Sequence, residues 1–138
     1  MLIGEAPGKE EIKKGKPFVG PSGKLLDKIL KKNKIDRKKL YITNLIKKKL
    51  PNNRKPNKKE IKKYLPILKK EIKKVNPSLI VLLGESVTKA LLSKSLSQAG
   101  GKLIKSQNYW YLSTYHPSAA RFPRIRKIIE KDLRKLKI

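Results

Sequence analysis

The chain has 138 residues, enough for one hydrophobic core, and 37 Lys and Arg against 10 Asp and Glu give it a formal net charge of +27. Such a charge favours polyanionic partners, nucleic acid first and an anionic membrane surface second, although a lysine-biased proteome alone would also produce it. With no Cys and one His, the chain excludes disulfides, thiol nucleophiles, and metal sites built on thiolates or several imidazoles. Because it has no apolar run of membrane-spanning length and no segment like a signal peptide, we expect a soluble, cytoplasmic protein with a single domain over residues 1–138.

Short apolar segments alternate with longer segments of helical periodicity along the chain. The predicted strands are residues 1–4, 40–46, 79–83 and 109–115. The predicted helices are residues 20–33, 58–76, 84–93 and 124–138. Apolar strands that alternate with helices indicate a parallel sheet covered by helices on both faces.

Local signals add detail to these segments. Ser22 is a candidate N-cap for the first predicted helix, and Pro66 is expected to kink or divide the second. The polar stretch 51–59 is predicted to be a loop, and residues 95–102 (SLSQAGGK) a flexible connection. Neither stretch has the composition of a domain boundary.

Polar and aromatic side chains follow each predicted strand. In an open parallel sheet, ligands bind beyond the carboxyl ends of the strands, so these residues are expected to share one rim. The rim segments are Glu5–Gly8 and Pro17–Gly20 after the first strand, Thr43–Asn44 at the second, Gly84–Ser86 after the third, and His116–Ala119 after the fourth. Taken singly, Glu5 could cap a turn, Asn44 could satisfy loop carbonyls and Phe18 could belong to the core. Taken together, four separate loops bring carboxylates, a ring, an amide and the only imidazole to one place.

This set of groups suits the cleavage of an N-glycosidic bond. An Asn amide offers a donor and an acceptor to the imide edge of a pyrimidine, and a ring from the PFVG segment can stack on the base. His116 can donate to a carbonyl oxygen that becomes anionic. Carboxylates are unwelcome beside a phosphate, but they suit a sugar that becomes cationic and a water that must be oriented.

At these same residues the chain resembles family 4 of the uracil-DNA glycosylases, within the wider uracil-DNA glycosylase superfamily. The matching stretches are, in the family's order, GEAPGKEE, KPFVGPSGKLLD, DRKKLYITNLIK, LPNNRKPNKKEI, NPSLIVLLGESVTKALL and TYHPSAAR. The combination of GEAPG, PFVG, TN and HP is specific, whereas each motif alone is weak. The resemblance implies a three-layer α/β/α sandwich with a central four-stranded parallel sheet and a pocket for a flipped-out uracil.

The resemblance also implies roles for the rim residues. Phe18 would stack on uracil, Asn44 would read its imide edge, and His116 would stabilise the negative charge that develops at O2. Glu5 and Glu11 would position water and support the cationic sugar. The backbone amides of Ala6 and Gly8 would contact uracil, and Thr43 and Tyr115 would shape the walls. The residues expected to contact DNA are Ser22, Lys24, Asn53, Arg54, Ser118, Ala119 and Arg121.

The sequence departs from the family in three places. The family's four-cysteine iron–sulfur cluster has two ligands near Lys48 and Tyr64, and with no cysteine we expect no metal or other cofactor. The usual acidic pair of the first motif is Glu11-Ile12, so one carboxylate is missing. The leucine that wedges into the base stack is replaced near Ala120, where Arg121 or Phe122 could fill the gap. We therefore expect activity on single-stranded DNA and weaker flipping in duplexes.

Three functional interpretations follow. The first is a monomeric, monofunctional uracil-DNA glycosylase that releases uracil, leaves an abasic site and so starts base excision repair. The second is a catalytically weak or inactive DNA-binding relative of the same fold, which the absent cluster and the missing acid favour. The third is a basic architectural protein whose rim is incidental.

Overall fold

A computed structural model describes residues 1–136, which form one five-stranded sheet with the strand order β2-β1-β3-β5-β4. The strands are β1 (Leu2–Gly4), β2 (Ile42–Asn44), β3 (Ile80–Leu83), β4 (Leu103–Ser106) and β5 (Tyr109–Thr114). β2, β1, β3 and β5 are parallel and correspond to the four predicted strands, while β4 pairs antiparallel with β5 at the sheet edge. The predicted α/β fold with a parallel sheet of four strands is therefore confirmed, and the antiparallel fifth strand, β4, was not expected.

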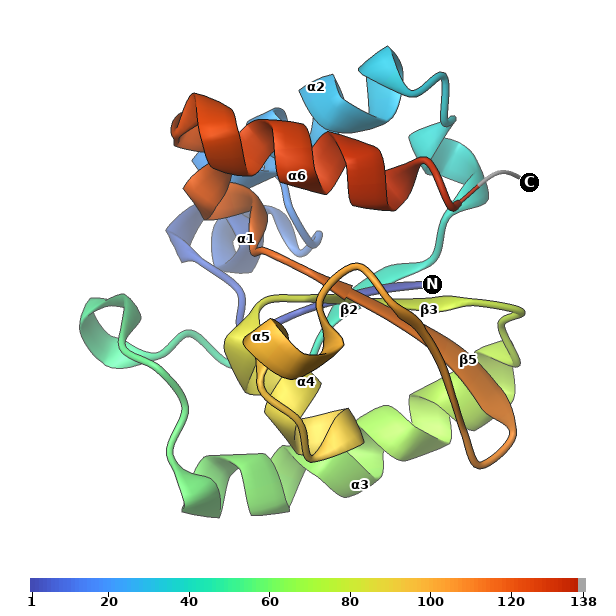
Figure 1. Ribbon diagram of the computed structural model, residues 1–138. Helices are drawn as coiled ribbons and strands as arrows, with labels where there is room; N and C mark the ends of the chain where they lie inside the picture. The colour runs from blue at the N-terminus through green and yellow to red at the C-terminus, as the bar shows by residue number, and fades with distance from the viewer. Residues whose placement is uncertain (137–138) are drawn as a thin grey trace.

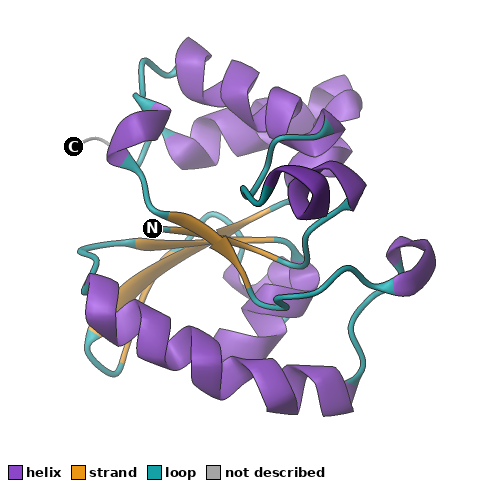
Figure 2. Cartoon of the chain, turned by 180° about the vertical axis from the view of Figure 1, so that it is seen from behind, coloured by secondary structure: helices purple, strands orange, loops and turns teal. Residues whose placement is uncertain are grey.

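Helices cover both faces of the sheet, as Figures 1 and 2 show from opposite sides. One face carries α2 (Pro21–Lys32) and α6 (Pro123–Leu133), and the other carries α3 (Lys58–Val75) and α4 (Glu85–Leu92). Two short helices, α1 (Lys9–Lys14) and α5 (Leu96–Ala99), lie in the connections, with 3-10 turns η1 (Arg37–Lys39), η2 (Pro51–Asn53) and η3 (Pro117–Arg121). The expected three-layer α/β/α arrangement is present.

The alternation of side chains along the strands divides the core between the two faces. In β3, Ile80 and Leu82 pack on the α3 side, whereas Val81 and Leu83 pack on the α2 and α6 side. All four side chains are fully buried, as expected for a central parallel strand that is covered twice. The apolar run LIVLL therefore has partners on both faces.

The structure corrects several local expectations. The N-cap of α2 is Gly20, with Pro21 in the first turn, so Ser22 lies inside the helix rather than capping it. Pro66 does not divide α3, which runs unbroken over eighteen residues. The stretch 95–102 contains α5, which Ser95 caps by accepting a hydrogen bond from the Gln98 amide. The final residues of the last predicted helix, 137–138, lie outside the described residues.

The missed strand β4 has a weak signal in the sequence. It has four residues and pairs with β5 alone, so every second side chain is exposed, including Leu103. A two-residue connection, Gln107-Asn108, leads directly into β5, and Gln107 adopts a positive φ of 55°. That short polar connection before the apolar run of β5 was the sign of a hairpin that the sequence offered. None of the helices within residues 1–136 combines the length and apolar character that crossing a bilayer requires.

Candidate active site

A cleft of about 1130 Å³ opens beyond the carboxyl ends of the parallel strands. After β1 the chain adds β2 on one side of it, and after β2 the chain crosses back and adds β3 on the other side. The order in which strands are added therefore reverses between the parallel strands β1 and β3. Open α/β sheets bind ligands at this reversal point. The cleft walls include most of the rim residues expected from the sequence: Glu5, Ala6, Gly8, Glu11, Phe18, Asn44, Tyr115 and His116.

Asn44 is the last residue of β2 and lies opposite Gly4 of β1 in the parallel register. Its side chain is 7% exposed, and its Oδ1 atom is buried without a hydrogen-bond partner among the described residues. Leaving a buried polar atom unpaired costs about 1–3 kcal/mol, so such an atom in a cleft wall indicates a ligand partner.

Gly4 allows Asn44 and Phe18 to approach each other closely. A Cβ atom at residue 4 would lie 2.5 Å from Cζ of Phe18 and 2.6 Å from Oδ1 of Asn44, closer than real side chains come. The missing side chain of Gly4 therefore leaves room for the ring and the amide at the floor of the cleft.

Phe18 lies between the core and the cleft. Its side chain is 5% exposed and packs in the core cluster on the α2 and α6 face, while its ring centroid lies 5.7 Å from that of His116. Its φ of 50° is in the left-handed region, which is strained for a bulky side chain. Strain of this kind persists only where the surrounding structure fixes the backbone.

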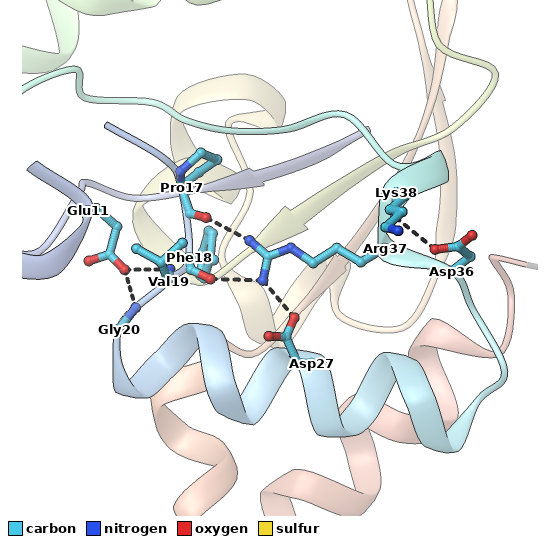
Figure 3. A network of polar contacts seen from close by, with 9 residues as sticks. All are labelled: Glu11, Pro17, Phe18, Val19, Gly20, Asp27, Asp36, Arg37 and Lys38. Atoms are coloured by element: carbon cyan, nitrogen blue, oxygen red, sulfur yellow. Dashed lines mark hydrogen bonds and ion pairs between the residues drawn. The ribbon is translucent and has the colours of Figure 1, made fainter. Parts of the chain in front are cut away.

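Glu11 ties two loops of the cleft together. Its Oε2 accepts hydrogen bonds from the amides of Val19 at 2.7 Å and Gly20 at 2.6 Å (Figure 3). Its Oε1 accepts one from the Gly8 amide at 3.0 Å. Burial works to raise the pKa of the Glu11 carboxyl, but the backbone amides that donate to it, those of Gly20 and Val19 first, together leave that pKa below its ordinary value. Glu11 is thus an ionised link between the segments before and after α1.

His116 is held as a neutral imidazole that presents its Nε2–H. The backbone amide of Ser118 donates to Nδ1 at 3.1 Å, so Nδ1 is an acceptor and the ring proton sits on Nε2. Burial lowers the pKa of His116 to about 4. Gly84, with a φ of 112°, passes behind the ring, where a Cβ atom would lie 3.4 Å from the Cβ of His116.

Glu5 follows β1 directly and lines the cleft. Its backbone carbonyl accepts a hydrogen bond from the Ile46 amide at 2.9 Å, which continues the β1–β2 pairing beyond the strand. No hydrogen bond to its carboxylate is present among residues 1–136. Of the two predicted acids, Glu5 is the one whose carboxylate remains free for a ligand or water.

A polar network supports Asn44 from the side away from the cleft. Lys47 Nζ donates to the Asn44 carbonyl at 2.7 Å and to Thr43 Oγ1 at 2.8 Å, and it pairs with Glu71 of α3 at 2.6 Å. Tyr41 donates to the same carboxylate, and that hydrogen bond raises the pKa of Tyr41 to about 12. Thr43 belongs to this network and does not line the cleft, contrary to its expected place in the wall.

An arm, residues 47–57, forms the outer wall of the cleft and extends from the body of the molecule in both overall views. Leu50 anchors it in the core beside Tyr64. Arg54 donates to both carboxylate oxygens of Glu60 at 2.7 and 3.0 Å. These bonds lower the pKa of Glu60 to about 2. Arg54, expected to contact DNA, is therefore also a support of the arm.

The residues around Lys48 and Tyr64 cannot hold the iron–sulfur cluster that is usual in the family the chain resembles. Nζ of Lys48 lies 3.6 Å from the Glu60 carboxylate, and the Tyr64 ring is buried in the core. Neither side chain can replace a thiolate, and the chain contains no Cys. Within residues 1–136, no group of three or more His, Asp or Glu side chains is arranged to hold a metal ion. Ion pairs and core packing occupy the place where the cluster would give support.

The structure separates the residues expected to contact DNA into two groups. Those that line the cleft are Ser22, Asn53, Arg54, Ser118 and Ala119. Lys24 is exposed on α2 outside the cleft, and the exposed Arg121 stacks its guanidinium on the Phe122 ring at 4.8 Å. Phe122 is 52% exposed directly after η3, three residues beyond Ala119 of the cleft lining.

Sequence reasoning missed the residues that support the site from behind, chiefly Arg37, Lys47 and Glu71. Arg37 and Lys47 flank β2 in a chain where Lys and Arg are abundant, so neither is distinguished by composition. Glu71 is one of only ten acids and lies on a helix rich in lysine. Its rarity was the one signal available from the sequence.

Comparisons with known proteins agree with this geometry. The family model "Uracil DNA glycosylase superfamily" matches residues 1–136. A type-4 uracil-DNA glycosylase of Saccharolobus solfataricus is 42% identical over 99% of this chain and 69% of its own length, and that of Sulfurisphaera tokodaii is 40% identical over 99% and 68%. A third, from Archaeoglobus fulgidus, is 33% identical over 99% of the chain and 74% of its own length. The chain belongs to the uracil-DNA glycosylase superfamily, and within it to the type-4 uracil-DNA glycosylases.

Proposed function

We propose that the chain is a monofunctional uracil-DNA glycosylase that hydrolyses the N-glycosidic bond of a flipped-out deoxyuridine and leaves an abasic site. The observation that carries the proposal is the buried, unpaired Oδ1 of Asn44, which shares one cleft with the Phe18 ring and the neutral His116. The names of the relatives, type-4 uracil-DNA glycosylases, support the same substrate.

Uracil fits the groups at the cleft floor. Asn44 Oδ1 accepts the N3–H of the base, and its Nδ2 donates to O4, which satisfies the buried amide. Phe18 stacks on the base. The Gly8 amide already donates to Glu11, so the Ala6 amide is the proposed backbone contact. Cytosine lacks the N3–H, so this amide orientation favours uracil.

Bond cleavage follows from the charges around the base. The C1′–N1 bond breaks, its electron pair passes to uracil, and the negative charge at O2 is stabilised by the Nε2–H of His116. Burial lowers the pKa of His116, which keeps its imidazole neutral at neutral pH. A neutral imidazole can donate this hydrogen bond without the cost of burying a charged ring. The carboxylate of Glu5 stabilises the cationic sugar and takes a proton from the attacking water as its oxygen bonds to C1′; that proton then passes to the uracil anion. Glu11 acts in this scheme through loop position, because backbone amides already occupy its carboxylate.

DNA is the partner, bound through the net charge of +27 and the lysine-rich surface around the cleft. Flipping costs a few kcal/mol, least in single strands or mispaired positions. The stacked pair Arg121–Phe122 is proposed to fill the vacated space in a duplex. We propose a monomer that acts without a cofactor and prefers single strands.

The test uses an oligonucleotide with one uracil, incubated with the protein in EDTA and then treated with alkali. The proposal predicts strand scission at the uracil, a loss of about 10²–10³ in rate for His116→Ala and Asn44→Ala, and unchanged binding in gel shifts. Scission absent on both single-stranded and duplex substrates, with binding retained, would instead support the DNA-binding relative without turnover. Equal loss of binding and turnover in the two variants would contradict the assigned roles.

A further inference from the structure

The peptide group between Phe18 and Val19 is held at both ends by opposite charges. Its carbonyl oxygen accepts a hydrogen bond from Nη1 of Arg37 at 2.8 Å, and its N–H donates to Oε2 of Glu11 at 2.7 Å (Figure 3). A cation thus meets the negative end of the peptide dipole and an anion meets the positive end. Charge-assisted hydrogen bonds of this kind are about twice as strong as neutral ones.

The neighbouring groups extend the same arrangement. Nη2 of Arg37 donates to the Pro17 carbonyl at 2.7 Å, and Oε2 of Glu11 also accepts a hydrogen bond from the Gly20 amide at 2.6 Å. The guanidinium binds two successive carbonyls and the carboxylate binds two successive amides. We call Arg37 and Glu11, with the peptide between them, the Phe18 clamp.

The clamp acts on the strained part of the loop. Phe18 has the only positive φ among residues 16–20 of the loop, 50°, and the rotation that would relieve it also turns the clamped peptide. No ladder hydrogen bond fixes this loop, because Pro17–Gly20 lies outside every strand. Asp27 of α2 accepts a hydrogen bond at 2.6 Å from Nη1, the same guanidinium nitrogen that donates to the Phe18 carbonyl.

We infer that Arg37 and Glu11 are positioning residues for base stacking, which hold the Phe18 ring at the cleft floor by clamping the peptide that follows it. The inference deepens the proposed function and rests on it, since the stacked base is the proposed uracil. It assigns a role to Arg37, a residue outside the cleft lining, and gives Glu11 a role without contact to water or sugar.

Arg37→Gln tests the clamp, because glutamine cannot bind both carbonyls with a charged fork. The expected result is a fall in kcat/KM on a uracil oligonucleotide of about tenfold, since a misplacement near 1 Å can cost about 10²-fold. The matched control is Asp36→Ala, which removes the cap of the same 3-10 turn, a bond to the Lys38 amide, without touching residues 17–20. This control is expected to change kcat/KM by less than about twofold.

Repeating Arg37→Gln in a Phe18→Leu protein separates an effect on the position of the ring from an effect on the stability of the whole protein. Phe18→Leu keeps an apolar side chain of similar volume in the core and removes the ring face. In that background, Arg37→Gln is expected to lower kcat/KM by less than about twofold, because residues that act through one another are not additive. The same tenfold loss in both backgrounds, or a loss with Asp36→Ala as large as with Arg37→Gln, would overturn the inference.

A readout independent of activity keeps the clamp distinguishable from the proposed function. The amide proton of Val19 is expected to shift in NMR spectra of both Glu11→Gln and Arg37→Gln, which act on opposite ends of its peptide group, and to stay in place in Asp36→Ala. A Val19 signal unchanged in Arg37→Gln would overturn the clamp even if the wild-type protein excises uracil. An inactive wild-type protein with shifted signals would instead contradict the proposed function alone.

Discussion

The two sides of the proposed base pocket are built differently. Asn44 ends a strand, and its position follows from the β1–β2 ladder, with Lys47 binding its carbonyl. Phe18 sits in a loop without ladder bonds, in a left-handed conformation held by Arg37 and Glu11. A group on a strand takes its geometry from the backbone, whereas a group on a loop depends on charged side chains from other elements. Substitutions that remove the supports of Asn44 and of Phe18 should therefore lower the rate of uracil excision by different amounts.

Gly4→Ala should produce the largest effect, because it disturbs both sides at once. The new Cβ would lie 2.5 Å from the Phe18 ring and 2.6 Å from the Asn44 amide, so both must move. Since a misplacement near 1 Å can cost about 10²-fold, we expect single-turnover excision to fall by more than about 10²-fold.

The control for Gly4→Ala is Gly15→Ala, at a left-handed position with open space around the Cβ. It should lower the melting temperature through backbone strain while leaving the excision rate within about twofold of wild type. An excision rate for Gly4→Ala equal to that of the control would show that ring and amide do not share the space above Gly4.

Lys47→Met tests the strand side alone and should have a smaller effect than Arg37→Gln. It removes the bond to the Asn44 carbonyl and the pair with Glu71, but the β1–β2 ladder remains. We expect kcat/KM to fall by about threefold, and by less in an Asn44→Ala background. Lys32→Met is the matched control, since it removes one charge and an ion pair with Glu130 far from the cleft. A loss larger than that of Arg37→Gln would reverse the proposed order of the two sides.

The smallest expected effect is the contribution of His116 to the pH dependence of stability. Because the chain has only one histidine, the titration of its imidazole can be followed without overlap from others. Its imidazole NMR signal should titrate near pH 4 in the folded protein and near the ordinary 6.5 in denaturant. Between these values the unfolded chain binds a proton that the folded protein does not. The free energy of unfolding should therefore rise as pH increases from about 4 to 6.5, and this contribution should be constant above that range. A folded-state midpoint near 6.5 would contradict the half-buried, neutral imidazole.

The four parallel strands could be predicted because they are short apolar runs, and the four long helices because their apolar side chains repeat with the helical period. The rim residues could be predicted for a topological reason, since parallel strands bring their carboxyl ends to one edge. The strand β4 could not, because none of its four side chains is fully buried and its residues therefore leave no apolar pattern. The supports of the site could not either: Arg37 meets Phe18 only through the fold, and nothing in a lysine-rich sequence marks Lys47. The two acids of the first motif looked equivalent, and only the three backbone amides around Glu11 distinguish it from Glu5.

The most direct measurement is mass spectrometry of the base released from a single-stranded oligonucleotide that carries one uracil among the four normal bases, with EDTA present. We expect free uracil in an amount equal to the abasic sites formed, no free cytosine or thymine, and almost no uracil release from Asn44→Ala. Intact oligonucleotide after prolonged incubation with folded wild-type protein, or uracil release that Asn44→Ala leaves unchanged, would contradict uracil excision through Asn44.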